Sequence, residues 1–265
     1  MSMIDVIIPA YNCSATLGRT LASLVAQTDS NFNTIIVDDC STENIKSIID
    51  NYINTLSITY VRNQENLGCG MSRQVGIDNS TGEFFCFLDS DDMFMPYTIE
   101  VLNTLIKKNP NVEFVHSHFY EQMNSNLGLH TSSFMYCHGK LYNRQLIEKY
   151  QIRNSPEVKW YDDFYFNSIC VELLNIQGLP IPIYLWCNNQ NSVIRKEDKE
   201  RDKNINSDYL NAMEKSVKFI LQYKDNVNYL KQSLDNLIQK QHLQKTPFTE
   251  QEYQKIIELS NYIKE

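Results

Sequence analysis

The stretch Glu83-Phe84-Phe85-Cys86-Phe87-Leu88-Asp89-Ser90-Asp91-Asp92 decides the fold, because an apolar run long enough for a buried strand ends in three carboxylates. An apolar run bounded in this way is typical of a central strand in a parallel α/β sheet. Open α/β sheets bind ligands beyond the carboxyl ends of their strands. Three acids at such an end repel one another, so we expect a bound cation. Their oxygen atoms suit magnesium or manganese, which can hold a diphosphate.

Two earlier strands of the predicted sheet also end in polar clusters. The run 4–8 leads into Pro9-Ala10-Tyr11-Asn12, and the run 32–37 leads into Asp38-Asp39-Cys40-Ser41. Helical patterns separate these strands, and this alternation with short connections predicts a doubly wound, mostly parallel sheet flanked by helices. A solvated acidic turn would explain one of these clusters, but it would not explain their recurrence at successive strand ends.

The remaining pattern predicts a sheet that becomes irregular and then a helical extension. We expect helices at 14–25, 45–53, 69–82, 95–107, 143–150 and after 163, and strands at 57–61, 112–117 and 179–186. Ser14 is the expected cap of the first helix, whose buried face includes Val25. Pro180 and Pro182 indicate an edge strand, and residues 118–140 indicate a less regular, antiparallel segment. From Lys199 onward, apolar residues repeat at helical spacing, and Thr249-Glu250-Gln251-Glu252 forms a capping box.

Composition narrows the class of protein. The 265 residues are 42% apolar and carry a net charge of −8. Residues 196–265 hold 12 basic and 12 acidic side chains, so the whole excess lies in residues 1–195, which disfavours a nucleic-acid partner. The seven cysteines are scattered and contain no C-x-x-C pair. This usage, with no signal-peptide or membrane-span pattern, predicts a cytoplasmic protein that is soluble or at most peripheral to a membrane.

The order and spacing of the polar clusters resemble the family 2 glycosyltransferases, which have the GT-A fold. Members of that family begin with a strand ending in P-x-Y-N, followed by a strand end of the form V-D-D-x-S. A segment N-x-G-x-x-x-[AS]-R-N-x-G then leads into G-E-[YF]-[IF]-x-F-L-D-x-D-D. The corresponding residues here are 8–12, 37–41, 66–76 and 82–92. The resemblance is close over residues 4–117 and looser up to 195, and four ordered motifs are specific.

The resemblance implies an α/β fold of the GT-A type with a helical C-terminal appendage. Residues 1–198 would form the glycosyltransferase domain, in which 1–117 bind the nucleotide sugar and 118–198 face the acceptor. Residues 199–265 would form the helical extension. Its apolar stripes indicate ordinary packing surface, with a homodimer contact or a membrane-surface contact as the alternatives.

For the donor, the resemblance implies that Pro9, Tyr11 and Asp39 line the pocket for the base, with Asp39 accepting a hydrogen bond from the base edge. Arg73 would lie over the nucleotide, and Asp89 would reach the ribose or the donor sugar. UDP is the carrier that the family favours. The complete set of expected nucleotide contacts is Pro9, Ala10, Tyr11, Asn12, Asp38, Asp39, Gly68, Arg73, Asp89 and Ser90.

The resemblance also implies a metal ligand and a general base. Asp91 would bind the divalent Mn²⁺ or Mg²⁺ that holds the diphosphate, while Asp92 would cap the next turn. Family members carry an acidic pair at a later helix start, and its Asp deprotonates the acceptor hydroxyl. Tyr161-Asp162-Asp163-Phe164 matches this context, with Asp163 as the base and Asp162 in place of the usual Glu. The reaction would then be one displacement with inversion; the alternative is that either Asp merely caps the helix.

One loop departs from the family pattern. Many relatives place an Arg and a His shortly before a Ser in the loop that closes over the diphosphate. Here residues 187–192 contain no basic side chain, and the next is Arg195. His138 lies after the irregular segment, and a lone His in such a position is more often structural. The candidate acceptor or phosphate contacts are His138, Trp160, Asp162 and Arg195.

Other functions compete with this interpretation. Haloacid-dehalogenase-type phosphatases also have a strand ending in D-x-D, but they need Thr or Val where this chain has Met93. An inactive nucleotide-sugar-binding module would lack the metal or base position, and Asp91 and Asp163 are both present. Among acceptors we favour a surface glycan or its lipid-linked precursor. A hydroxylated base in DNA is the alternative, which the acidic first domain disfavours.

Overall fold

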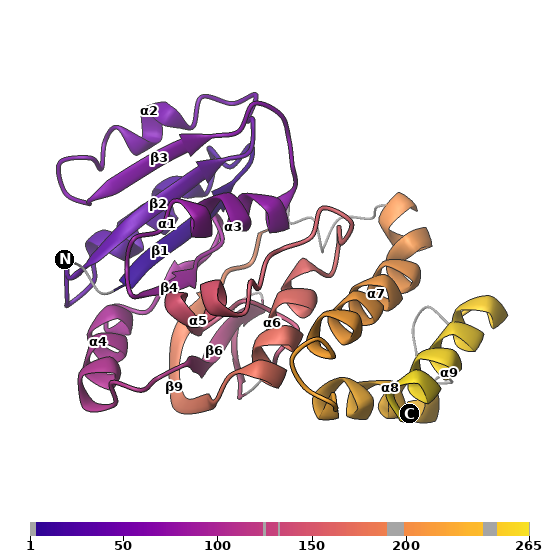
Figure 1. Cartoon of the computed structure of the whole chain (residues 1–265). Helices are drawn as coiled ribbons and strands as arrows, with labels where there is room; N and C mark the ends of the chain where they lie inside the picture. The colour runs from indigo at the N-terminus through magenta and orange to yellow at the C-terminus, as the bar shows by residue number, and fades with distance from the viewer. Residues whose placement is uncertain (1–3, 124–125, 132, 190–198, 241–247, 265) are drawn as a thin grey trace.

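A computed structural model describes residues 4–123, 126–131, 133–189, 199–240 and 248–264, and the elements named below lie in these ranges (Figure 1). Arg195, a candidate phosphate contact, lies outside them. The strands are β1 (Ile4–Ala10), β2 (Phe32–Asp38), β3 (Ile58–Arg62), β4 (Phe84–Phe87), β5 (Met93–Phe94), β6 (Phe114–Met123), β7 (Asn126–His130), β8 (Lys140–Asn143) and β9 (Ile176–Trp186). The helices are α1 (Leu17–Val25), α2 (Lys46–Ile49), α3 (Cys69–Asp78), α4 (Thr98–Lys108), α5 (Arg144–Lys149), α6 (Asp162–Leu173), α7 (Lys199–Ile220), α8 (Asn228–Lys240) and α9 (Glu250–Lys264).

The strands in the described ranges form a single sheet in the order β3-β2-β1-β4-β8-β6-β9-β5, with β7 paired to β6. β3, β2, β1 and β4 run parallel, as expected for strands joined by helical crossovers. From β8 onward the sheet is mixed: β8 is antiparallel to both β4 and β6, whereas β9 is parallel to β6. The predicted α/β sheet with flanking helices is confirmed, and its second half contains the antiparallel pairs expected there.

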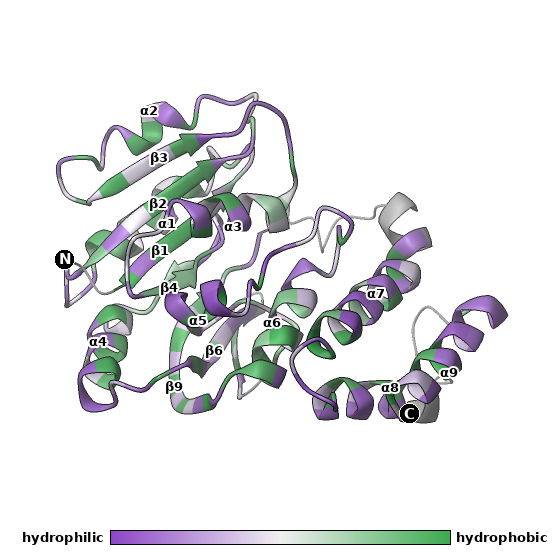
Figure 2. Ribbon diagram, in the orientation of Figure 1, coloured by the Kyte–Doolittle hydropathy of each residue, from purple (hydrophilic) through white to green (hydrophobic). Residues whose placement is uncertain are grey.

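Helices cover both faces of the sheet, because alternate residues of the central strands point to opposite sides. Ile4, Val6 and Ile8 of β1 pack with residues of α1 and α4 in one core. Ile7 packs with residues of α3 and α6 in the other. α3 lies so close to β1 that a Cβ on Gly76 would come within 2.2 Å of Ile7, which explains a glycine inside this helix. Figure 2 shows the resulting apolar colouring of β1 and β2.

The C-terminal helices continue the second core. Leu210, Met213 and Val217 of α7 are fully buried in the same cluster as residues of α6, and α8 and α9 add to it. α9 begins with the predicted capping box: Thr249 N–H donates to Glu252 Oε2, and Glu252 N–H donates to Thr249 Oγ1. No helix in the described part of the chain is both long and apolar enough to span a bilayer.

Several local predictions were wrong in their bounds. β1 continues through Pro9 and Ala10. β4 pairs with β1 only as far as Ile7, so the sheet needs no hydrogen bond from the Pro9 nitrogen, which carries no hydrogen. Ser14 does not cap α1, because the N-cap is Thr16 and no side chain makes a capping bond there, and Val25 is 43% exposed. α2 spans only Lys46–Ile49.

The last predicted strand is longer in the structure than the predicted range 179–186, because β9 begins at Ile176. Beyond β9, the two-residue strand β5 pairs only with Tyr184 and Leu185. Pro180 and Pro182 therefore lie on a stretch that has no strand on its outer side in the described residues, close to the predicted edge.

Candidate active site

The first two strand ends meet at one edge of the sheet, because Ala10 of β1 is in register with Asp38 of β2. Asn12 joins the two loops: its N–H donates to Ser41 Oγ (3.0 Å), and its Oδ1 accepts from Thr42 N–H (2.8 Å). Asn12 and Cys40 both have left-handed backbone, which costs a non-glycine residue about 1–3 kcal/mol and often marks a functional site. Pro9 and Ala10 are buried beneath these loops, whereas the Tyr11 side chain is half exposed and open to a ligand.

Asp38 and Asp39 have different surroundings. Asp38 is fully buried, and its carboxylate accepts from Tyr60 Oη (2.7 Å), from the Ser41 N–H (2.8 Å) and from Arg62. Burial alone would raise its pKa, but these donors hold the pKa of Asp38 below its ordinary value. Asp38 is thus enclosed by protein groups and serves the β2–β3 region more than a ligand.

Asp39 holds the loop that leads into α3. It accepts from Asn63 Nδ2, Leu67 N–H and Gly68 N–H, each at 2.8 Å. Gly68 has φ +85°, a left-handed conformation that favours glycine and turns its N–H toward this carboxylate. A carboxylate has about four lone-pair sites, so these bonds leave room for one further donor, such as a base edge.

Arg73 of α3 links the loop after β4 to the start of α6 through three carboxylates. Its Nη2 lies 2.8 Å from Asp89 Oδ1, and its Nη1 lies 2.6 Å from Asp162 Oδ2 and 2.5 Å from Asp163 Oδ1. The arginine side chain is only 5% exposed. The prediction that Arg73 points toward the strand ends agrees with this placement, but its guanidinium is engaged with acids and does not lie open over a nucleotide site.

Asp162 and Asp163 occupy the first turn of α6, where the helix dipole favours negative charge. The interpretation that one of them N-caps this helix is wrong, because the N-cap is Tyr161 and α6 starts at Asp162. α3 and α6 touch at Gly70, where an added Cβ would lie 2.7 Å from Asp162 Cβ. Burial, only partly offset by Arg73, raises the pKa of Asp162 to about 7.

Asp163 is the more accessible acid of the pair. Its side chain is 18% exposed, against 11% for Asp162. Its second oxygen accepts from the Cys137 N–H at 3.0 Å. The loop before β8 therefore positions this carboxylate from one side and Arg73 from the other.

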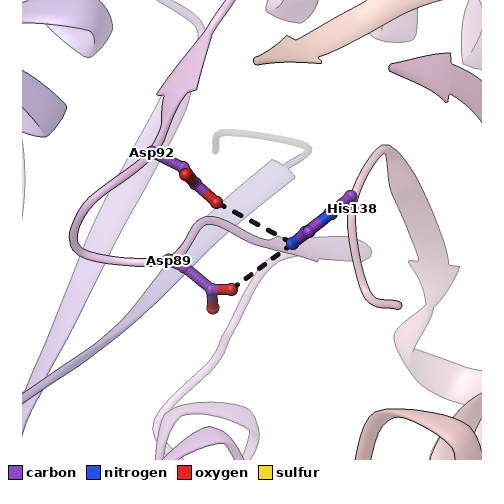
Figure 3. Close-up of side chains that lie close together, drawn as sticks. All are labelled: Asp89, Asp92 and His138. Carbon is purple, nitrogen blue, oxygen red and sulfur yellow. Dashed lines mark ion pairs between the residues drawn. The ribbon is translucent and has the colours of Figure 1, made fainter. Parts of the chain in front are cut away.

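A histidine from the same loop faces the acids that follow β4 (Figure 3). His138 Nε2 lies 3.6 Å from Asp89 Oδ2 and 3.8 Å from Asp92 Oδ2. The imidazole is stacked between Tyr136 and Tyr184 and is 4% exposed, which leaves little surface for an acceptor. Burial opposes ionisation of Asp89, but Arg73 and His138 hold its pKa below the ordinary value.

Asp92 does not cap the following turn, in contrast to the prediction. It is buried and accepts from Tyr184 Oη (2.6 Å) and from the Cys187 N–H (2.8 Å), so it secures the end of β9. Burial and the charges of Asp89 and Asp91 raise its pKa well above the ordinary value. Asp89, Asp92 and His138 together place three metal-ligating atoms within 4.8 Å of one another.

Asp91 stands apart from this buried group and is partly exposed. Its Oδ2 accepts from Asn189 Nδ2 at 2.7 Å, and Arg19 donates to its backbone carbonyl. Burial and the charge of Asp89 raise the pKa of the Asp91 carboxyl. The excess of negative charge and the oxygen-only donors of Asp89 and Asp91 fit a hard divalent cation. Ser90, between them, uses its carbonyl to accept from Thr20 Oγ1.

Sequence reasoning missed several residues that build this site. Asn63 and Tyr184 bind site carboxylates, but a polar residue after one strand and a tyrosine within another carry no local pattern that distinguishes them. Trp160 was predicted as a contact; it is half-buried, with the Lys159 ammonium 5.1 Å from its ring centroid. Its backbone N–H donates to Asp208 of α7, a residue that the sequence did not single out.

Comparison with known proteins identifies the family. The model of the family described as Glycosyl transferase family 2 matches residues 5–171. A glycosyltransferase of Haemophilus influenzae is 42% identical over 114 residues, which cover 43% of this chain and 38% of that protein. Escherichia coli WfaP, named UDP-Glc:alpha-D-GlcNAc-diphosphoundecaprenol beta-1,3-glucosyltransferase, is 33% identical over 121 residues, covering 45% of this chain and 47% of WfaP. Both matches span less than half the length of the curated relative.

Solved structures agree on the fold. Staphylococcus aureus TarS 1-349, in complex with UDP-GlcNAc, aligns with a TM-score of 0.74 at 21% identity, covering 89% of this chain and 71% of that one. The mannosyltransferase PcManGT of Pyrobaculum calidifontis, in complex with GDP-Man and Mn²⁺, aligns with a TM-score of 0.61 at 15% identity, covering 82% and 64%. These likenesses support the GT-A fold. Because the family match extends over more than half of the sequence, the chain belongs to glycosyl transferase family 2.

Proposed function

We propose that this protein transfers a sugar from a UDP-sugar to an acceptor hydroxyl, with inversion at the anomeric carbon. One observation carries the proposal: a single buried arginine, Arg73, brings Asp89 from the end of β4 to Asp162 and Asp163 at the start of α6. Donor-side and acceptor-side acids therefore meet where the parallel strands end, which is where α/β sheets bind ligands. E. coli WfaP, which is named as a UDP-Glc-dependent glucosyltransferase, supports the choice of carrier.

The donor would bind over the ends of β1, β2 and β4. Tyr11 is exposed there, and Asp39 keeps one acceptor site for the base edge. Asp89 would accept from a hydroxyl of the ribose or the donor sugar. Arg73 would act as a positioning residue, because its guanidinium fixes the three carboxylates and has little surface left for the nucleotide.

Asp91, with Asp89, would hold the divalent cation. Their oxygen donors and the surplus of acidic groups fit Mn²⁺ or Mg²⁺. The negative charge on Asp89 raises the pKa of the Asp91 carboxyl, so two ionised carboxylates are unfavourable here without a cation. When bound, such a cation offsets the negative charge that develops on the departing nucleoside diphosphate. Asn189 Nδ2, which contacts Asp91 Oδ2, would orient this carboxylate.

Asp163 would serve as the general base. Its carboxylate would take the proton of the acceptor hydroxyl while the acceptor oxygen bonds to the anomeric carbon and the bond to the diphosphate breaks. Arg73 and the Cys137 N–H each contact one of its oxygens, which fixes the carboxylate for the approach of the acceptor. Asp162 is less suited to this role, because it lies against Gly70 beneath α3.

The acceptor would be a lipid-linked precursor of a surface glycan, handled in the cytoplasm. E. coli WfaP is named for transfer to alpha-D-GlcNAc-diphosphoundecaprenol, and this name supports the choice of acceptor.

The donor is tested with purified protein and a panel of sugar nucleotides, with and without Mn²⁺, by thermal shift and by release of nucleoside diphosphate. We expect one UDP-sugar to raise the melting temperature and to be hydrolysed slowly only when the metal is present. A folded protein that responds to none of the donors would overturn the proposed donor class. A response that does not depend on metal would remove the cation from the proposal.

The base is tested by Asp163→Asn with a GlcNAc-diphosphate lipid as acceptor. We expect transfer to fall by about 10²–10⁴-fold, the usual contribution of a general base, while binding of the donor is unchanged. Asp225→Asn is the matched control, because Asp225 is exposed between α7 and α8, and it should leave transfer unchanged. Transfer by Asp163→Asn at the wild-type rate would disprove the base assignment.

A further inference from the structure

The turn that precedes α6 is held by a carboxylate from the C-terminal extension. Asp208 of α7 accepts hydrogen bonds from three consecutive backbone N–H groups: Lys159 (3.2 Å), Trp160 (2.7 Å) and Tyr161 (3.2 Å). Its two oxygens share these donors, with Oδ1 facing Lys159 and Oδ2 facing the other two. A carboxylate with several amide donors is strongly oriented, because hydrogen bonds to a charged acceptor are stronger than neutral ones.

This contact lies immediately before the first turn of α6. The N-cap of α6 is Tyr161, whose side chain makes no capping bond. A capping side chain would accept from an N–H inside the first turn, whereas Asp208 accepts from the N–H of Tyr161 itself and of the two residues before it. Asp208 therefore fixes the entry of the chain into the helix, and it adds negative charge near the helix N-terminus.

The remaining contacts make α7 a firm support for this carboxylate. The Tyr209 ring packs against Tyr161 and Phe164, both at 4.9 Å between centroids. Ser216 is hydrogen bonded to Ser168 of α6 at 2.9 Å. Asp208 is therefore carried on a helix that is fixed to α6 along several turns.

We propose that Asp208 is a positioning residue for the general base, so that the C-terminal helical extension forms part of the catalytic machinery. This inference rests on the proposed role of Asp163. The turn held by Asp208 ends at Tyr161, immediately before Asp162 and Asp163, so its position sets where these acids meet Arg73. A displacement of about 1 Å at a reacting group can cost on the order of 10²-fold in rate. Donor affinity should change little, because the expected nucleotide contacts lie at the ends of β1, β2 and β4 and at the start of α3, and none belongs to residues 159–161.

The experiment compares Asp208→Ala, Asp208→Asn and the control Asn211→Ala in the full chain. Asn211→Ala removes a hydrogen bond between the same two segments, one turn along α7, but leaves residues 159–161 untouched. For each variant, kcat of transfer, KM for the donor, affinity for UDP, melting temperature and amide exchange of residues 157–164 are measured. Activity is assayed well below the lowest melting temperature, so that a loss of folded protein does not appear as a loss of rate.

We expect kcat to fall by about 10–100-fold in Asp208→Ala, with KM for the donor and affinity for UDP within a factor of about two of wild type. Asp208→Asn should be intermediate, because an amide oxygen still accepts but carries no charge. Amide exchange at 159–161 should quicken in the same order, whereas Asn211→Ala should keep the wild-type kcat. If Asp208→Ala does not fold, Asp208→Asn carries the test.

Two outcomes overturn the inference, and they are distinguishable. The inference is refuted if kcat in the Asp208 variants equals that of wild type, or falls no further than in Asn211→Ala. The proposed function still stands in that case, provided that Asp163→Asn is inactive. An active Asp163→Asn enzyme refutes the base assignment and this inference together.

Discussion

The polar residues at the ends of β1 and β2 differ from the acids at the start of α6 in what holds them. In the first region the partners lie 24 to 30 residues apart: Asn12 bonds to Thr42, and Asp39 bonds to Asn63 and Gly68. Around α6 one partner, Cys137, lies at a similar separation of 26 residues, but Arg73 is 89 residues before Asp162 and Asp208 is 47 residues after Tyr161. The first region is thus built from neighbouring strand ends and loops, whereas the acids of α6 also depend on two helices that are more distant in sequence.

In the proposed function, this difference separates the donor from the acceptor. The strand ends would bind the nucleotide, and the acids at the start of α6 would serve the acceptor. These acids depend on α3, on the loop before β8 and on α7. A change in the loop or in α7 would therefore move Asp163 and leave the ends of β1 and β2 in place.

The largest expected effect comes from removing the link between the two regions. Arg73→Met leaves three carboxylates in a buried site without their cation, and breaking a buried ion pair costs about 3–5 kcal/mol. Urea denaturation should show this loss of unfolding free energy, together with loss of transfer.

Arg62→Met is the matched variant on the donor side. The Arg62 side chain is 46% exposed, and its partner Asp38 would keep the bonds from Tyr60 and Ser41, so we expect a clearly smaller loss. Equal losses for the two arginines would show that the two regions are held in the same way.

A smaller effect is expected where α3 meets α6. Gly70→Ala would place a Cβ 2.7 Å from Asp162 Cβ, and overpacking of this kind costs about 1–3 kcal/mol. Because the clash pushes on Asp162, transfer should fall as well. Gly18→Ala in α1 is the control: its nearest neighbour is Ile48 Cγ2 at 3.8 Å, so the helix should gain about 0.5–1 kcal/mol. Thermal unfolding distinguishes them, and a stabilised Gly70→Ala would contradict the close approach.

The first half of the fold was predictable because burial of its strands leaves a clear pattern in the sequence. β1, β2 and β4 are almost entirely buried, so their sequences are mostly apolar and end abruptly in polar clusters. The second half lacks this clarity. β5 has only two residues, so its length gives no strand signal. β6 extends into a hairpin with β7 in which Leu127 and Leu129 are exposed, so the burial pattern does not predict this pairing.

The site residues that belong to the family motifs were predictable, whereas their long-range contacts were not. The motifs placed Arg73, Asp89 and Asp163 in one site, and the structure brings these three together. They did not show that Arg73 binds the acids, that Asp92 secures β9, or that Asp208 holds the turn before α6. Each of these contacts joins residues far apart in sequence, and no local spacing encodes such a pair.

The two regions should also differ in the pH dependence of their stability. The pKa of Asp162 is raised from its ordinary value of 3.8 to about 7, chiefly by burial. The folded protein therefore binds more protons than the unfolded chain between about pH 4 and pH 7, and this group makes stability fall as pH rises through that window. Asp38 has the opposite sign. Its lowered pKa contributes stability that is present above its ordinary value and is lost as pH falls toward the lowered one.

Urea midpoints measured from pH 3 to pH 8 separate the two contributions. Asp162→Asn should flatten the decline between pH 4 and pH 7, and Asp38→Asn should reduce the loss on the acid side, where Asp89 also contributes because its pKa is lowered. If Asp162→Asn gave a curve parallel to that of wild type, its carboxyl would already be ionised at pH 4. Arg73 would then outweigh burial at α6, as the donors around Asp38 outweigh it at β2, and the two regions would treat buried acids alike.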